Sequence, residues 1–157
     1  MTYDVTTTSS EATQAVAAKL APHLKGGEVV ELSSDLGGGK TTFVQGLAAA
    51  LGYHGAVTSP TFALSQIYAL PSGLELHHYD LYRLAEGGIV GEELAEDMAD
   101  PQVVTLIEWG GVVESGLPAD RLHITLEPVA ATARRLVFKS GGPVSERLLV
   151  ALRQEAA

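Results

Sequence analysis

A glycine-rich segment, Ser34–Thr41, carries the residue types needed to bind phosphate, in the order Ser-Asp-Leu-Gly-Gly-Gly-Lys-Thr. It follows the apolar run Val29–Leu32 and precedes an amphipathic helix pattern, which is the setting expected of a phosphate-binding loop. Glycines allow successive backbone N–H groups to point into one anion-sized hollow, and the helix start adds its positive dipole end. Lys40 would reach the β- and γ-phosphates, and the Thr41 hydroxyl would ligate Mg²⁺. The segment therefore predicts a P-loop for a nucleoside triphosphate with Mg²⁺.

One position of this loop departs from the usual pattern, because Ser34 stands where the first glycine is expected. A residue with a side chain is strained wherever the backbone needs a positive φ. The required features that remain are Gly39, Lys40, Thr41 and the strand–turn–helix setting. They favour a P-loop over the alternative, a flexible glycine-rich turn ahead of a helix.

Two carboxylates end strand-like segments further along the chain. Glu108 closes the apolar run Val103–Ile107, where the Walker B acid of a P-loop protein holds Mg²⁺ directly or through water. Asp80 ends the strand-like segment Leu74–Asp80, and there it could orient or activate an attacking water. The alternatives are a solvated strand end for Glu108 and, for Asp80, a cap on the turn that follows it.

Other candidates have weaker signals. Thr61, in the segment Ser59–Phe62, could offer its hydroxyl to the γ-phosphate or its metal, or could mark a rigid loop–strand junction. Trp109 could lie beside the nucleotide, on a partner surface or in the core. Arg83 is expected to form a surface or structural ion pair rather than to act as an arginine finger. Arg134–Arg135 is expected to decorate a late strand.

The two adjacent histidines are expected to play no part in catalysis. In the alternating pattern of Leu74–Asp80, His77 falls with the polar positions and is predicted to be solvated, whereas His78 falls with the leucines and is predicted to be packed. No histidine–carboxylate set with metal-ligand spacing accompanies either one.

The elements that must position these residues alternate between strand and helix patterns, which predicts an α/β domain. Thr8–Glu11 fits a capping box before a helix that ends near Gly26–Gly27. Further elements are a helix with Phe43, Leu47 and Leu51 on one face and Gly52 as its stop, strands over 61–70 and 74–80 joined by a turn at 71–73, a short helix around 92–96, strands at 103–107, 121–127 and 134–139, and a last helix carrying Leu148, Leu149 and Leu152.

Length and composition limit the class of protein. The 157 residues fit one domain over 1–157, and the absence of cysteine excludes a disulfide scaffold and a thiolate metal site. The net charge of −9 disfavours tight binding to bare nucleic acid. No apolar run approaches the length of a membrane span, and Met1–Ser10 lacks the profile of a secretory signal. We therefore expect a soluble cytoplasmic protein with no membrane association.

Four ordered blocks together resemble the TsaE family, the bacterial ATPase of tRNA threonylcarbamoyladenosine biosynthesis. The blocks are 35–42 (Asp-Leu-Gly-Gly-Gly-Lys-Thr-Thr), 59–62 (Ser-Pro-Thr-Phe), 78–84 (His-Tyr-Asp-Leu-Tyr-Arg-Leu) and 106–109 (Leu-Ile-Glu-Trp). The resemblance covers nearly the whole chain and implies a P-loop NTPase-type three-layer sandwich, with a mostly parallel, partly mixed sheet flanked by helices.

The resemblance also implies the cofactors ATP and Mg²⁺ and a role for each block. The nucleotide-binding residues would be Asp35, Leu36, Gly37, Gly38, Gly39, Lys40, Thr41, Thr42 and Trp109. Thr41 and Glu108 would hold the metal, and Asp80 and Thr61 would be catalytic.

The implied function is ATP hydrolysis in service of a protein complex. The ATPase of this family associates with a threonylcarbamoyl-transferase subunit (TsaD-like) and that subunit's inactive paralogue (TsaB-like). The complex modifies adenosine 37 of tRNAs that read codons beginning with A. The ATPase contacts tRNA only indirectly, is slow alone and is expected to be stimulated by its partners.

Two other classes of function stay open on the residues alone. A nucleotide-gated binding module with negligible turnover would explain Ser34. A small-molecule P-loop kinase would need an arginine-rich lid, of which the chain shows no sign. A GTPase is disfavoured because no Asn-Lys-x-Asp motif is present.

Overall fold

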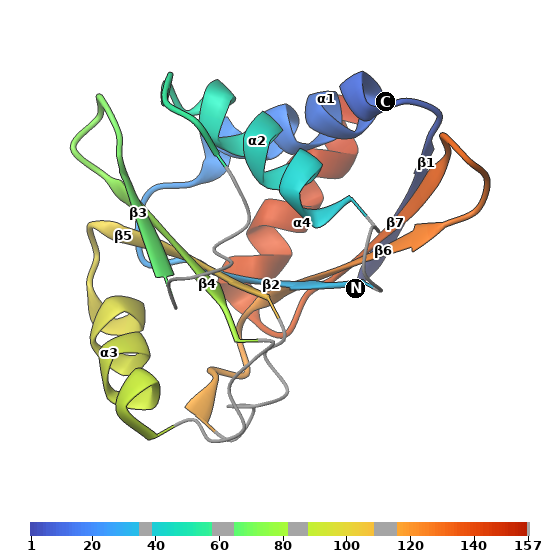
Figure 1. The fold of residues 1–157 in the computed structure, drawn as a ribbon. Coiled ribbons are helices and arrows are strands. Elements are labelled where there is room, and N and C mark those ends of the chain that lie inside the picture. Colours follow the sequence, from blue (N-terminus) through green and yellow to red (C-terminus); the bar gives the residue numbers. More distant parts are fainter. Residues whose placement is uncertain (35–38, 58–64, 82–87, 109–115, 157) are drawn as a thin grey trace.

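The structure is a computed structural model that describes residues 1–34, 39–57, 65–81, 88–108 and 116–156, with backbone only for 88–91 and 156. The strands are β1 (Thr2–Thr7), β2 (Val29–Ser33), β3 (Ser65–Ala69), β4 (Glu75–Asp80), β5 (Val103–Glu108), β6 (Leu122–Pro128) and β7 (Arg134–Lys139). The helices are α1 (Ser10–Leu20), α2 (Lys40–Ala50), α3 (Gly88–Ala99) and α4 (Pro143–Ala156), with a short 3₁₀ turn η1 (Ala21–His23) after α1. Figure 1 shows these elements around one twisted sheet.

The seven strands form one sheet in the order β1-β7-β6-β2-β5-β4-β3. The central strands β6, β2, β5 and β4 run parallel, whereas β1, β7 and β3 add to the two sides in antiparallel fashion. This confirms the expected α/β architecture with a mixed sheet. Parallel neighbours bring their carboxyl ends to the same edge, so the residues that end β2, β4 and β5 lie together.

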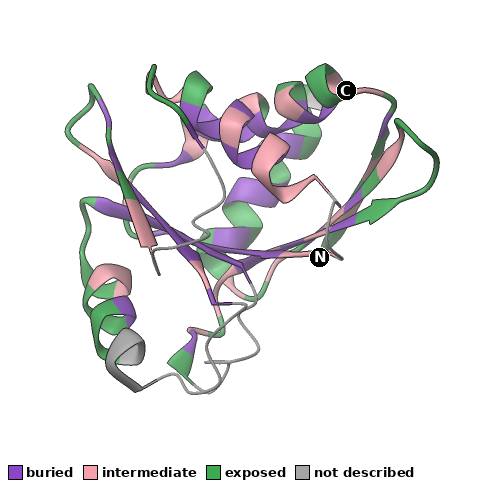
Figure 2. Ribbon diagram, in the orientation of Figure 1, coloured by how far each residue is buried: buried purple, intermediate pink, exposed green. Residues whose placement is uncertain are grey.

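Helices cover both faces of the sheet and make it the middle of three layers (Figure 1). Helices α1, α2 and α4 pack on one face, where the main core gathers around Phe43, Leu47 and Phe138. Helix α3 packs on the other face, where Leu94 joins a smaller core with Tyr79 and Ile107. Because both faces are covered, β2 and β5 are buried almost throughout (Figure 2).

Local sequence signals account for the start and end of the helices beside the P-loop. The Ser9 hydroxyl caps α1 by accepting a hydrogen bond from the Ala12 N–H at 3.0 Å, so the cap lies one residue after Thr8, the position that the capping box Thr8–Glu11 predicts. Gly39 precedes α2 with φ of +100°, and Gly52 follows that helix with φ of +94°. Both values lie where only glycine is relaxed.

The expected hairpin turn at residues 71–73 is confirmed. Strands β3 and β4 pair antiparallel, and Gly73 has φ of +92°. The β-strands predicted at 121–127 and 134–139 are also present, with Arg134 and Arg135 at the start of β7 as expected. The part of the first predicted strand over 61–64 lies outside the described residues.

Three elements and one side chain differ from the expectation. The first helix, expected to end near Gly26–Gly27, ends at Leu20. Strand β1 had not been predicted, because a single edge strand with one half-buried face has little hydrophobic signal. The short helix expected around 92–96 is longer and spans Gly88–Ala99. His77 is 7% exposed, so the prediction that it is solvated was wrong. Its face of β4 is covered by α3, which the alternation of β4 alone could not reveal.

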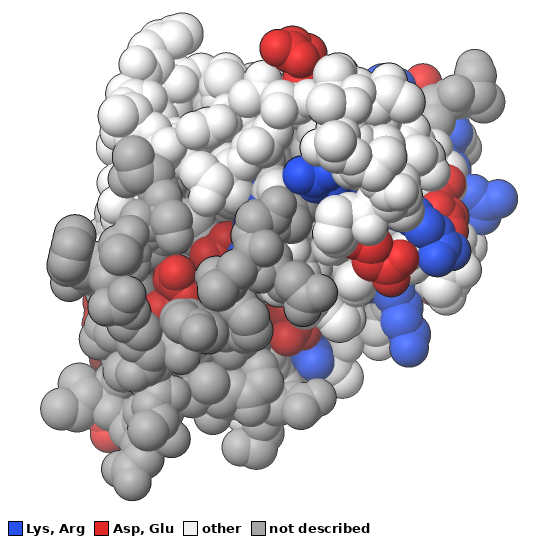
Figure 3. Space-filling view, turned by 45° about the vertical axis from the view of Figure 1, so that its right-hand side comes forward, with Lys and Arg blue, Asp and Glu red and all other residues white. Residues whose placement is uncertain are grey.

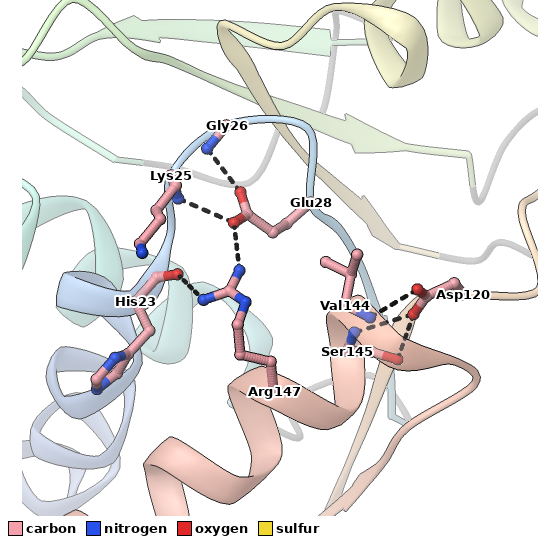
Figure 4. Close-up of polar contacts among 8 residues, drawn as sticks. All are labelled: His23, Lys25, Gly26, Glu28, Asp120, Val144, Ser145 and Arg147. Atoms are coloured by element: carbon pink, nitrogen blue, oxygen red, sulfur yellow. Dashed lines mark hydrogen bonds and ion pairs between the residues drawn. The ribbon is translucent and has the colours of Figure 1, made fainter.

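Two clusters of polar contacts connect α4 to the rest of the domain at the end where β2 begins (Figure 4). The buried Glu28 carboxylate accepts hydrogen bonds from the N–H groups of Lys25 and Gly26 and pairs with Arg147 of α4 at 3.1 Å. Asp120 caps the start of α4 by accepting from the N–H groups of Val144 and Ser145. Glu28 precedes β2 and the P-loop follows it, so these clusters lie at the opposite end of that strand from the predicted site.

Candidate nucleotide-binding site

The predicted P-loop connects the end of β2 to the start of α2. Residues 35–38 lie outside the described residues, but both flanks are described. The Lys40 ammonium donates to the Ser34 carbonyl at 3.3 Å, which ties the two flanks together. Phe43 N–H donates to the Gly39 carbonyl at 3.0 Å and closes the first helical turn. The geometry of any α-helix leaves its first N–H groups outside the intrahelical hydrogen bonds, which favours an anion at this position.

The two predicted carboxylates stand side by side next to this loop. Asp80 and Glu108 are register partners on the parallel strands β4 and β5, and Glu108 is also the partner of Leu32 on β2. The Leu81 N–H extends the pairing by donating to the Glu108 carbonyl at 3.1 Å. Tertiary structure thus brings together residues 40, 80 and 108, which lie far apart in the sequence.

Both carboxylates lie on the face of the sheet that α2 covers. Leu76 and Leu106 belong to the main core under α1, α2 and α4. Side chains alternate along a strand, so Asp80 shares the face of Leu76, and Glu108 that of Leu106. Glu108 is only 2% exposed, whereas Asp80 is partly exposed.

The burial of Glu108 fits a cation at this edge. Its Oε1 atom is buried and has no hydrogen-bond partner within the described parts of the chain. A buried carboxylate oxygen without a partner is costly unless a cation or donor satisfies it. No group of three or more His, Cys, Asp or Glu side chains suited to a metal occurs among the described residues. Mg²⁺ in P-loop proteins needs few protein ligands because phosphates and water supply the rest. Thr41, in the first turn of α2, and Glu108 therefore fit the expected metal.

A cavity of about 320 Å³ opens beside the P-loop. Gly39 and Thr42 line it from the start of α2, residues 8–11 and 13 line it from the start of α1, and Thr132 and Arg134 line it from the β6–β7 hairpin. Arg134 was expected only to decorate a late strand, because contact between β7 and the start of α2 depends on the sheet order. The cavity extends the candidate site away from the two carboxylates.

The two histidines of β4 lie on opposite faces of the sheet. His77 Nδ1 lies 2.7 Å from Asp97 Oδ2 of α3, and the Tyr79 hydroxyl donates to the same oxygen. Burial, and then the hydrogen bond to Asp97, raise the pKa of Tyr79 well above its ordinary value. His78 is fully buried, as its position in the pattern predicted, and its Nε2 lies 3.6 Å from Glu108 Oε1.

The described site contains only part of the predicted set. Gly39, Lys40, Thr41, Thr42, Asp80 and Glu108 lie along one edge of the sheet. Predicted residues outside the described ranges are Asp35, Leu36, Gly37, Gly38, Thr61, Arg83 and Trp109.

A strand and a helix on either side of the predicted phosphate loop, with acids ending the neighbouring parallel strands, are typical of the P-loop NTPase fold, a class whose members bind nucleotides. Residues 7–136 match the sequence model of the family described as threonylcarbamoyl adenosine biosynthesis protein TsaE. The chain belongs to this family, as the four sequence blocks had predicted.

Individual relatives agree with the family match. The chain is 36% identical to the tRNA threonylcarbamoyladenosine biosynthesis protein TsaE of Bacillus subtilis over 143 residues, which cover 90% of this chain and 88% of the relative. It is 43% identical to the Streptomyces coelicolor protein of the same name over 111 residues, covering 69% and 74% of the two chains. The crystal structure of Bacillus subtilis YdiB superposes with a TM-score of 0.80 at 31% identity, covering 100% of this chain and 97% of that one.

Proposed function

We propose that this chain is a Mg²⁺-dependent ATPase subunit required for threonylcarbamoylation of adenosine 37 in tRNAs that read codons beginning with A. It would act in the cytoplasm on the complex that performs the transfer, not as the transferase. The family match and the names of the relatives support the pathway. The observation that carries the ATPase assignment is the pairing of Asp80 with Glu108 beside the P-loop helix.

The proposed placement of ATP follows from the two parts of the site. The phosphates would lie against the start of α2, where Lys40 and the helix N-terminus supply positive charge. The nucleoside would enter the adjoining cavity, which Thr42 and Gly39 line on the side of the phosphates. The bound metal would neutralise phosphate charge, and Thr41 and Glu108 are the residues that would hold it.

In the proposed reaction, a water oxygen forms a bond to the γ-phosphorus while the bond from that phosphorus to the β–γ bridging oxygen breaks. The products are ADP and inorganic phosphate, with release of a proton. Asp80 is partly exposed and adjoins Glu108, which supports a role in orienting the water and accepting its proton. Thr61 would assist at the γ-phosphate, as the family resemblance implies.

The proposed partners are a TsaD-like transferase subunit and its inactive TsaB-like paralogue. The charge of the chain supports contact with tRNA through these partner subunits. On the face seen in Figure 3, Lys and Arg side chains of the described residues lie interspersed with Asp and Glu, and the net charge of the chain is −9. Tight tRNA binding needs clustered basic side chains that neutralise phosphates. No described helix is both long and apolar enough to cross a membrane.

The test is ATP hydrolysis by the purified chain, alone and with the two partner subunits, for the wild type and for Asp80→Ala and Asp80→Asn. We expect slow turnover alone, strong stimulation by the pair, and loss of stimulated turnover by about 100-fold or more in both variants. ATP binding should persist in the variants, because the proposed role of Asp80 is to act on water. Nucleotide binding and complex formation without stimulation would favour a nucleotide-gated binding module, and phosphate transferred to an acceptor would favour a kinase.

A further inference from the structure

His78 and Glu108 form a buried polar pair behind the candidate metal position. His78 is 0% exposed and Glu108 is 2% exposed, and the distance from Nε2 to Oε1 is 3.6 Å. Neither imidazole nitrogen of His78 has a hydrogen-bond partner among the described residues. The same is true of Glu108 Oε1. Buried polar atoms are rarely left unpaired, so such a pair calls for an explanation.

The strand register keeps this pair together. On the parallel strands β4 and β5, His78 is the partner of Leu106, two residues before Glu108. His78 and Glu108 therefore share one face as diagonal neighbours, in reach of each other across the pair of strands. Asp80, the register partner of Glu108, lies two residues beyond His78 on that same face. His78 therefore lies next to Glu108 on the side of the core.

The 3.6 Å separation is longer than a hydrogen bond but too short to hold a water between the two atoms. A small rotation of either side chain would let an Nε2–H group donate to Oε1. Carboxylates that hold metals are themselves commonly held by hydrogen bonds, and loss of that partner typically weakens metal binding by about 10–100-fold.

We propose that His78 is a positioning residue: its Nε2–H group orients the Glu108 carboxylate toward the metal that accompanies the nucleotide. This inference rests on the proposed function, because it takes Glu108 as a metal-holding residue. His78 would act through Glu108 and not by contact with the nucleotide. The alternating pattern of the sequence indicated only packing for His78, whereas the proposal gives this residue a role in the site.

The first test compares His78→Gln, which keeps an N–H donor near the Nε2 position, with His78→Met, which has a similar shape and no donor. The measurement is the Kd of a non-hydrolysable ATP analogue by calorimetry, with Mg²⁺ and with EDTA. We expect His78→Met to weaken the Mg²⁺-dependent gain in affinity by about 10-fold, and His78→Gln to keep most of it. Binding in EDTA should be unchanged in both.

A double-mutant cycle asks whether His78 acts through Glu108. In a Glu108→Gln background, His78→Met should cause no further loss of the Mg²⁺-dependent gain. The inference is overturned if His78→Met behaves as wild type, if both His78 variants lose the gain equally, if binding in EDTA falls as much, or if the losses add in the double variant. A wild type with no Mg²⁺-dependent gain would instead reject the metal assignment of the proposed function.

A measurement on the unaltered chain stands independently of whether the variants fold. In protein labelled with ¹⁵N-histidine, NMR distinguishes the two neutral imidazole tautomers. We expect His78 to carry its proton on Nε2, and this N–H signal to shift when Mg²⁺ is added to the nucleotide-bound protein. A proton on Nδ1 would overturn the inference, because Nε2 would then have nothing to donate.

Discussion

Single residues set the chemistry of the site through the constraints on their backbone and their burial. Glu108 is held in the core with an oxygen that lacks a hydrogen-bond partner among the described residues, which suits it to a cation. Gly39 is the N-cap of α2 and has φ of +100°, a backbone conformation that residues with side chains disfavour. The positive φ of Gly39 and the positive charge of Lys40 therefore lie within one turn of the start of α2.

At this scale we predict that Gly39→Ala weakens nucleotide binding by about 10-fold. A Cβ at Gly39 would meet nothing closer than 3.8 Å, so the cost comes from the positive φ rather than from a clash. Gly27→Ala is a matched control, because Gly27 has φ of +89° and open space around its Cβ position. Both variants should lose about 1–2 kcal/mol of stability in thermal unfolding. Calorimetric titration with ATP should weaken only for Gly39→Ala, and an equal change in both would contradict this prediction.

At the scale of elements, polar side chains join helices to the sheet and to each other. Asp97 of α3 accepts a hydrogen bond from the Tyr79 hydroxyl, and its Oδ2 lies 2.7 Å from His77 Nδ1, which secures α3 on the second face. Asp120 caps α4 from the segment before β6, with further hydrogen bonding to the Ser145 hydroxyl. These contacts set where the helices lie, beyond what their apolar faces specify.

The cap of α4 predicts a dependence of stability on pH. Burial alone would raise the pKa of Asp120, but hydrogen bonds from the Ser145 hydroxyl and N–H and from the Val144 N–H outweigh it and lower the pKa below the ordinary 3.8. A group with a lowered folded-state pKa contributes stability above its unfolded value and loses it as the pH falls through the folded value.

We therefore expect Asp120→Asn to cost about 1 kcal/mol at pH 7, because the amide keeps one acceptor oxygen but puts an N–H group where the second oxygen accepts a hydrogen bond. The difference from wild type should shrink as the pH falls below 3.8, when wild-type Asp120 also becomes protonated. Urea unfolding across pH 3–7 measures it, with Glu92→Gln on the exposed side of α3 as the charge-matched control. A penalty that does not change with pH would show that the charge of Asp120 is not what holds the cap.

In the whole molecule, the two ends of β2 lie in regions with different roles. The P-loop follows β2, and the Glu28 cluster precedes it (Figure 4). Through Arg147, this cluster ties the last helix to the segment between η1 and β2, two parts of the chain that are far apart in sequence. Stability at this end should therefore be separable from nucleotide binding at the other.

We predict that Arg147→Met destabilises the fold by about 2 kcal/mol, because it leaves the buried Glu28 carboxylate without its counter-charge. Two backbone N–H groups still serve Glu28, and Arg147 is 42% exposed, which keeps the loss below that of a fully buried pair. Nucleotide affinity should be unchanged. Arg153→Met, at an exposed position of α4, is the control and should have little effect in chemical unfolding. A large fall in nucleotide affinity for Arg147→Met would refute the separation of the two ends.

The sequence by itself determined the α/β class, the P-loop and the family. Each depends on local order along the chain: the glycines before Lys40 and Thr41, the apolar run that ends at Glu108, and the hairpin turn at 71–73. Signals of this kind survive without knowledge of distant contacts, because turn chemistry and the alternation of side chains act over a few residues.

Only the tertiary structure decided which residues meet. Register between β4 and β5 brings Asp80 beside Glu108 and His78 behind it, and the sheet order brings the β6–β7 hairpin to the start of α2. The burial of His77 likewise depends on α3 covering the second face. Strand pairing and the choice of face arise from packing between segments far apart in the chain, and no local pattern encodes them.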